Sequence, residues 1–343
     1  MRVAVLANLK QNAPSSHRKA NDGWAELDSR HTVDTLVEVF RKAGHEAEFF
    51  EGDLRLVGEL PRFAPDLCFN LCEGHYGDAR ESHVPALLEM MRLRFSGAGV
   101  RALAVTLDKP TTKHVLVSHG LATPAFQVMD HDDAPLRPGL DFPLVVKPAH
   151  EGSGMGVTDD SLVRDEASLR REVGRLVEHY AQPALVERYL PGREITVGMV
   201  GNPRGEPLSD GPWRDLPARG GVRILPLYEV LLHGGLYTDE VKNHWEGAWE
   251  HGRHYVCPAP MDDALRRKIE DLAVATFRAT GCRDVARVDL RIDEHGEPMV
   301  LEINALPGLS PGWSDLTLEA AAAGLSYDDL VLGIARSAVS RPL

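Results

Sequence analysis

The chain has 343 residues, 43% of them hydrophobic and 26% charged, and its formal net charge is −13. These proportions are typical of a globular protein of two or three domains. The negative charge argues against nucleic acid as the main partner, since contacts to phosphates need a basic surface. No apolar run approaches the roughly 20 residues that span a bilayer, and the N-terminus lacks signal-peptide features, so we expect a cytoplasmic protein without a membrane partner.

The first hundred residues alternate between predicted strands and helices. VAVLA at 3–7 is typical of a buried strand, and 28–44 predicts an amphipathic helix that stops at a glycine. The almost wholly apolar segment 65–74 predicts a strand of a parallel sheet covered on both faces, and a helix is expected at 84–93. This alternation predicts an open α/β domain over residues 1–107.

A second domain is predicted for residues 108–185, with one lysine at the start of a helix and another at the end of a buried strand. These are Lys109 in LDKP and Lys147 in FPLVVK. The glycine-rich EGSGMG at 151–156 fits neither a P-loop nor a dinucleotide-binding fingerprint. Glycine lets backbone N–H groups approach phosphate closely, so we interpret this loop as a flexible hairpin flap over phosphates.

Two glutamates bracket the end of the next predicted strand, in PALVERYLPGRE. Glu187 and Glu194 are well placed for the edge of an adenine or the hydroxyls of a ribose, although two solvated carboxylates are the simpler interpretation of this segment alone. The strand predicted at 195–202 would return from the PGRE turn.

The third predicted domain, residues 186–343, mixes helices and strands as in an α+β protein. A mobile loop is expected at 233–256 and a helix at 261–281. A strand hairpin at 285–304 and a helical stretch at 315–339 complete the chain.

The predicted hairpin gathers four polar side chains on one face. If its turn is symmetric about 295–296, Asp289 lies opposite Glu302 and Arg287 lies opposite Asn304. Residues two apart on a strand share a face, so two carboxylates, an amide and a guanidinium form one patch. Mg²⁺ prefers such oxygen ligands together with substrate phosphates. We interpret the patch as a metal site, the alternative being a salt-bridged sheet surface.

Taken together, these motifs resemble the ATP-grasp superfamily and, within it, the D-alanine–D-alanine ligase family, over nearly the whole chain. The resemblance is carried by SGAGVRALAVTLDKPTTK, VVKPAHEGSGMGV, LVERYLPGREITVGMVG, ARVDLRID and VLEINALPGLS. It implies a three-domain ATP-grasp fold with an N-terminal open α/β domain. It also implies a ligase that forms a peptide bond through an acyl phosphate, with ATP, two Mg²⁺ ions (Mn²⁺ being possible) and a possible homodimer.

The resemblance also implies roles for individual residues. ATP would contact Lys109, Lys147, the flap residues Glu151, Gly152, Ser153 and Gly154, the adenine neighbours Glu187 and Leu190, and the ribose neighbour Glu194. The metal ions would be held by Asp289, Glu302 and Asn304. Catalytic roles would fall to Arg287 and Gly308 at the oxyanion, to Ser153 in the flap, and to Lys242 in the mobile loop.

The sequence departs from the family around the amino-acid pockets. Asn243 follows the mobile-loop lysine where the family usually has a tyrosine. Candidate substrate contacts are Glu26, Asp28, Glu73, Ser310 and Ser314. D-Alanine is the first substrate to consider. The alternatives are a ligase that makes another dipeptide or an amide in specialised metabolism and, in a different class, an ATP-binding or phosphotransfer module that is not a ligase.

Overall fold

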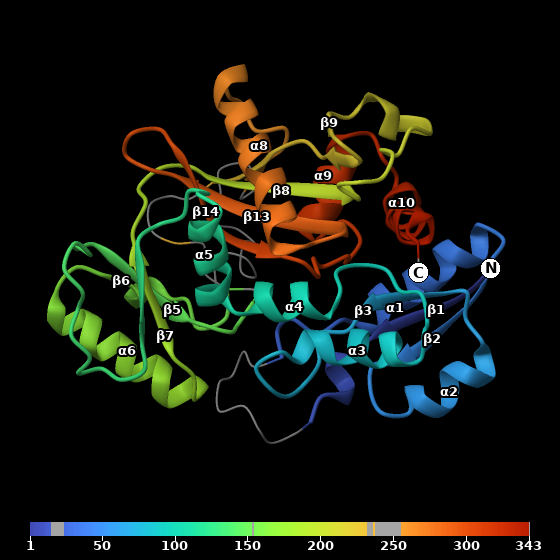
Figure 1. Cartoon of the computed structure of the whole chain (residues 1–343), viewed down its shortest axis with the longest axis horizontal. Coiled ribbons are helices and arrows are strands. Elements are labelled where there is room, and N and C mark those ends of the chain that lie inside the picture. The colour runs from blue at the N-terminus through green and yellow to red at the C-terminus, as the bar shows by residue number, and fades with distance from the viewer. Residues whose placement is uncertain (15–23, 153, 232–235, 237–254, 343) are drawn as a thin grey trace.

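The computed structural model describes residues 1–14, 24–152, 154–231, 236 and 255–342, and their strands form three sheets. The sheets occupy separate regions around the helices α4 (Val100–Leu107) and α5 (Lys109–Ser118), which lie near the centre (Figure 1). Within the described residues, no helix combines the length and the apolar composition needed to cross a membrane.

The N-terminal sheet is parallel, as the sequence predicts, with β1 in the centre. Its strands, in spatial order, are β2 (Glu46–Glu51), β1 (Arg2–Ala7) and β3 (Leu67–Leu71). Alternate residues of β1 serve two cores: Val3 and Val5 belong to one, Ala4 and Leu6 to the other.

Both faces of this sheet are covered by helices. One core contains residues of α1 (Arg30–Lys42) and of the C-terminal helix α10 (Tyr327–Ser340). The other contains residues of α2 (Leu56–Phe63) and α3 (His83–Met90). Helix α2, which includes a proline, is not predicted by the sequence pattern. The two ends of the chain therefore share one core (Figure 1).

The second sheet is antiparallel and is covered by one long helix. Its spatial order is β4 (Phe126–Met129), β7 (Ala184–Arg188), β5 (Leu144–Pro148) and β6 (Leu162–Val163). Helix α6 (Glu166–Tyr180) packs its apolar side on these strands. The strand expected after the glycine-rich loop is β6, which is only two residues long.

The third sheet is built around β8 (Glu194–Gly201). Its other strands are β13 (Asp284–Ile292), β14 (Pro298–Asn304), β10 (Val222–Ile224), β11 (Tyr228–Val230), β9 (Ala218–Arg219) and β12 (Tyr255–Val256). One face packs on α8 (Asp263–Thr280) and α5. Residues of α9 (Asp315–Ala322) and α10 contribute to the core on the other face.

One sequence expectation is wrong at this level. β8 does not return alongside β7, because β7 pairs only within the second sheet and β8 within the third. The helical stretch expected at 315–339 is confirmed and consists of two helices, α9 and α10, which are separated at Gly324, whose φ is +74°. A domain boundary at 185 would divide β7, so we propose that the second domain ends after Arg188. We also propose that the first domain ends at residue 107.

The predicted pairing of the hairpin is confirmed at the polar patch: Asp289 faces Glu302 and Arg287 faces Asn304. Nearer the turn the register shifts by one residue, so that Leu290 pairs with Val300. Leu301 is thus the extra residue of a β-bulge between the turn and the patch.

Candidate active site

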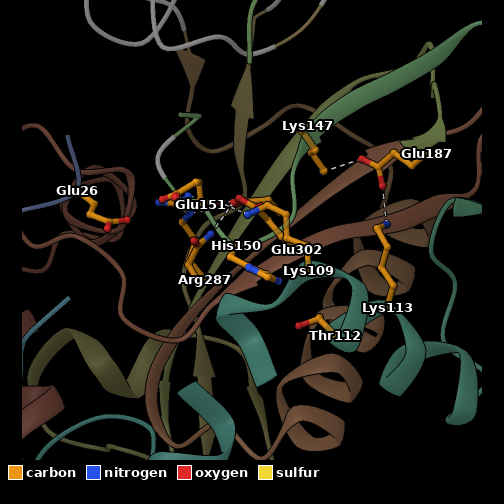
Figure 2. A network of polar contacts seen from close by, with 12 residues as sticks. Glu26, Lys109, Thr112, Lys113, Lys147, His150, Glu151, Glu187, Arg287 and Glu302 are labelled. Carbon is orange, nitrogen blue, oxygen red and sulfur yellow. Dashed lines mark hydrogen bonds and ion pairs between the residues drawn. The ribbon is translucent and has the colours of Figure 1, made fainter. Parts of the chain in front are cut away.

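Two cavities meet beside the hairpin. The larger has a volume of about 430 Å³ and the smaller about 120 Å³. Five residues line both of them: Lys109, Glu151, Arg287, Asp315 and Glu302. This shared wall joins side chains from α5, the glycine-rich loop, β13, β14 and α9, and Figure 2 shows Lys109, Glu302, Arg287 and Glu151 clustered there.

The polar patch on β13 and β14 is a connected network centred on Asp289. Arg287 donates to both of its carboxylate oxygens, at 3.0 and 2.9 Å. Asn304 and Thr196 donate to it at 2.8 and 2.9 Å. Arg287 also pairs with Asp315 at 3.1 Å. The three oxygen-bearing side chains proposed to hold the metal therefore lie on one face, with a guanidinium beside them.

Glu302 is held by cations from other elements. Its carboxylate lies 3.2 Å from the Lys109 ammonium at the start of α5. Burial works against its ionisation, but the charges of Lys109, Lys147 and Arg287 outweigh burial and lower its pKa to about 2. Glu302 is therefore ionised at neutral pH. Lys109 also donates to the backbone carbonyl of Glu151, which ties the glycine-rich loop to this wall.

Two lysines bracket Glu187, which lines the smaller cavity together with Lys147, while Lys113 lies buried behind it. The carboxylate oxygens of Glu187 lie 2.6 Å from Lys147 and 2.6 Å from Lys113, and Figure 2 shows this chain of contacts. Burial raises the pKa of Glu187, but the two ammonium groups outweigh it and leave the pKa below its ordinary value. Lys113 is not among the residues predicted from the sequence, although it lies one helical turn after Lys109 in DKPTTK.

Glu194 also lines the smaller cavity, as do Leu190 and Gly154. Burial raises the pKa of Glu194 to about 7, because Arg291, 3.5 Å away, compensates the lost hydration only in part. The predicted nucleotide residues of β5, β7 and β8 are thus brought to one cavity.

The larger cavity receives the predicted substrate residues. Glu26, Asp28, Glu73, Gly152, Asn304, Gly308, Ser310 and Ser314 all line it. Its C-terminal side is closely packed: the Ser310 N–H donates to Ser314 Oγ at 3.0 Å, and a Cβ at Gly308 would lie 2.9 Å from the same oxygen. Only glycine leaves this approach open.

Arg80, which the sequence analysis missed, joins the N-terminal part of the chain to the glycine-rich loop. Its guanidinium donates to both oxygens of Glu26 at 3.0 Å, to the His150 carbonyl at 2.9 Å and to Glu151 at 3.2 Å. The side chain is 3% exposed. In the sequence, the one sign of a role for Arg80 is the cluster of charged residues that follows the strand predicted at 65–74. Ser153 and Lys242 lie outside the described residues, as does most of the loop 233–256.

Comparison with known proteins gives the family. A family model described as the D-ala D-ala ligase C-terminus matches residues 115–212 and 216–335. The chain belongs to the D-alanine–D-alanine ligase family. It is 32% identical over 308 residues to the D-alanine–D-alanine ligase of Bordetella petrii, covering 87% of this chain and 84% of that protein. It is 38% identical over 313 residues to the uncharacterized protein y4sG of Sinorhizobium fredii, with coverage of 88% and 85%.

The fold of this family member agrees with a solved relative. The crystal structure of the D-alanine–D-alanine ligase from Bacillus anthracis complexed with ATP matches with a TM-score of 0.72 at 21% identity, covering 98% of this chain and 97% of that one. The mixed α/β class and the ATP-grasp fold expected from the sequence are confirmed.

Proposed function

We propose that this protein is an ATP- and Mg²⁺-dependent ligase that joins the carboxylate of one amino acid to the amine of another. One observation carries the proposal: Lys109, Arg287 and Glu302 line both cavities. A nucleotide phosphate in the smaller cavity and a carboxylate in the larger one would meet at these residues. D-Alanine is the first substrate to test, because ligases of D-alanine are among the relatives.

In the smaller cavity, ATP would lie with its adenine near Glu187 and Leu190 and its ribose near Glu194. Lys109 and Lys147 would contact the phosphates, covered by Glu151, Gly152, Ser153 and Gly154. We also propose that Lys242 contacts the γ-phosphate and that Ser153 helps to cover the phosphates. Both residues lie outside the described part of the chain.

The patch on β13 and β14 fits magnesium. Asp289, Glu302 and Asn304 would hold the ions, with the phosphates as further ligands, and Mn²⁺ ions offer the same coordination. Within the described residues, no cluster of three His, Cys, Asp or Glu side chains gathers for a metal. A set of two carboxylates and an amide agrees with Mg²⁺, which rarely takes a cage made only of protein ligands. When bound, Mg²⁺ neutralises charge on the phosphoryl oxygens.

The reaction would proceed in two steps. The carboxylate oxygen of the first amino acid attacks the γ-phosphorus, the bond to the β–γ bridging oxygen breaks, and ADP leaves. The neutral amine of the second amino acid then attacks the acyl carbon, and phosphate departs as the amine loses a proton. Lys109 and Lys147 would stabilise the phosphoryl oxygens in the first step. Arg287 and the N–H of Gly308 would stabilise the tetrahedral oxyanion in the second.

Two alternatives remain open to test. A related ligase could use other amino acids or form an amide in specialised metabolism instead of serving cell-wall peptidoglycan. A non-ligase ATP-binding or phosphotransfer module is the other class, and Arg287 speaks against it, since nucleotide binding alone does not require a guanidinium beside the carboxylate site. We further propose a cytoplasmic enzyme acting on small molecules as a homodimer.

The decisive experiment follows ADP release by the purified protein with Mg-ATP and single or paired D- and L-amino acids, with products identified by mass. A coupled product together with ADP would establish the ligase and name its substrates. ATP hydrolysis without a coupled product, or phosphate transfer to a substrate, would favour the second class.

A further inference from the structure

The larger cavity, where the amino acids are proposed to bind, is lined by more negative than positive side chains. Seven carboxylates line the cavity: Glu26, Asp28, Glu73, Glu81, Glu151, Glu302 and Asp315. The lysines and arginine that line it are Lys10, Lys109 and Arg287. An enclosed carboxylate is costly unless a cation or a hydrogen-bond donor meets it, so each carboxylate should have an identifiable partner.

Four of the seven have partners in the protein. The pairs are Glu302 with Lys109, Asp315 with Arg287, and both Glu26 and Glu151 with Arg80. All of these lie on the shared wall or beside the glycine-rich loop, where the nucleotide phosphates are proposed to bind. Each carboxylate in this part of the cavity therefore has a cation in contact, with Arg80 shared by two of them.

The other three carboxylates line the cavity from separate segments of the chain. Asp28 precedes α1, Glu73 follows β3, and Glu81 lies in a short helical turn before α3. Within the described residues, none of these three side chains forms a hydrogen bond or an ion pair. Lys10 acts electrostatically on Asp28. Arg80 acts on Glu73 and Glu81, and Lys109 acts on Glu81, but both cations already form ion pairs with other carboxylates. Burial raises the pKa of both, and the charge of Glu81 raises that of Glu73 further.

We propose that the amino acid bound beside Glu73 and Glu81 carries a second cationic group in its side chain, as a diamino acid does. This inference rests on the proposed ligase function and names the substrate class of the same site. An ordinary amino acid has one ammonium, which can compensate only one of the two remaining glutamates, while its carboxylate faces Lys109 and Arg287. A second ammonium would meet the other glutamate.

The test compares each cationic amino acid with a neutral one of similar length. Ornithine is set against norvaline, lysine against norleucine, and 2,3-diaminopropionate against 2-aminobutyrate, each as both enantiomers with Mg-ATP and alanine as co-substrate. We expect kcat/KM for at least one diamino acid to exceed that of its neutral partner about tenfold or more, the scale of one charge-assisted contact.

The outcomes separate this inference from the function on which it rests. Dipeptides formed equally well from neutral amino acids would overturn the inference and leave the ligase standing, since the protein's own residues would then neutralise the cavity. The absence of any coupled product would overturn the ligase itself.

Glu81→Gln supplies the residue-level test, and Glu89→Gln is its control, because Glu89 lies on the nearby α3, is exposed and does not line the cavity. We expect Glu81→Gln to lower the preference for the diamino acid about tenfold and Glu89→Gln to leave it unchanged. Without nucleotide, a diamino acid should also raise the melting temperature of the wild type, and should raise it less in Glu81→Gln. An equal preference and an equal thermal shift in both variants would refute the role of Glu81.

Discussion

Lys113 and Glu187 form an ion pair of 2.6 Å in which the lysine side chain is fully buried. Lys113 also donates to Thr123 Oγ1 at 2.8 Å, and Lys147 pairs with the second oxygen of the glutamate at 2.6 Å. One carboxylate therefore compensates two buried ammonium groups from α5 and β5. The position of Glu187 in the smaller cavity depends on both contacts.

This arrangement predicts unequal costs for removing its members. Glu187→Gln leaves two enclosed cations facing each other and should lower the free energy of unfolding by about 3–5 kcal/mol. Lys113→Met leaves Glu187 paired with Lys147 and should cost less, about 1–3 kcal/mol. Urea unfolding monitored by circular dichroism measures both. A larger loss in Lys113→Met than in Glu187→Gln would contradict the shared role of the carboxylate.

Glu194 predicts a pH-dependent stability. Burial raises its pKa from about 4.5 to about 7, so between these values the folded protein keeps a proton that the unfolded chain has released. Stability therefore falls as the pH rises through this window, by about 3 kcal/mol in total. Glu194→Gln removes the titration and should be more stable than the wild type at pH 8 but not at pH 4.

Thermal unfolding of both proteins across this pH range checks the prediction, and the KM for ATP should rise in the variant if Glu194 binds the ribose. Equal pH profiles for the two proteins would show that Glu194 is ionised without cost.

Arg80 predicts a coupling between the N-terminal part and the glycine-rich loop. Arg80→Met leaves Glu26 and Glu151 enclosed without their common cation and should destabilise the protein by about 3–5 kcal/mol. Arg80→Lys keeps the charge but loses the fork of donors, so its effect should be intermediate. Limited proteolysis near residue 151 and urea unfolding measure the two effects. A wild-type response in Arg80→Met would rule out the coupling.

The proposed metal site predicts a loss of activity without a loss of fold. Asp289→Asn and Glu302→Gln should each lower the apparent affinity for the Mg²⁺ that turnover requires by about 10–100-fold, while the circular dichroism spectrum is retained. Glu297→Gln is a matched control on the same hairpin, since the Glu297 side chain is exposed and pairs with Lys268 away from the patch. Near-normal turnover and Mg²⁺ dependence in both site variants would refute the metal role.

The sequence predicted the patch because strand alternation and pairing are local properties. Asp289 and Glu302 were placed opposite each other from an assumed symmetric turn, and the pairing is confirmed although Leu301 bulges between them and the turn. The return of β8 beside β7 was wrong, since nothing local tells a tight turn from a crossing between two sheets.

Arg80 and Lys113 were missed for a similar reason. Arg80 contacts Glu26, 54 positions before it, and Glu151, 71 positions after it. Lys113 contacts Glu187, 74 positions after it. Neither residue stands in a motif that suggests a buried cation. Only the assembled fold brings their partners to them.

The shared wall also decides which properties of the protein can change independently. Substitutions at Lys109, Arg287 or Glu302 would alter the kinetic constants for nucleotide and amino acid together, because these residues line both cavities. The N-terminal segments that carry Asp28 and Glu81 line only the larger one. Redesign of the product can therefore be confined to these two short segments, while the machinery that activates the carboxylate stays untouched.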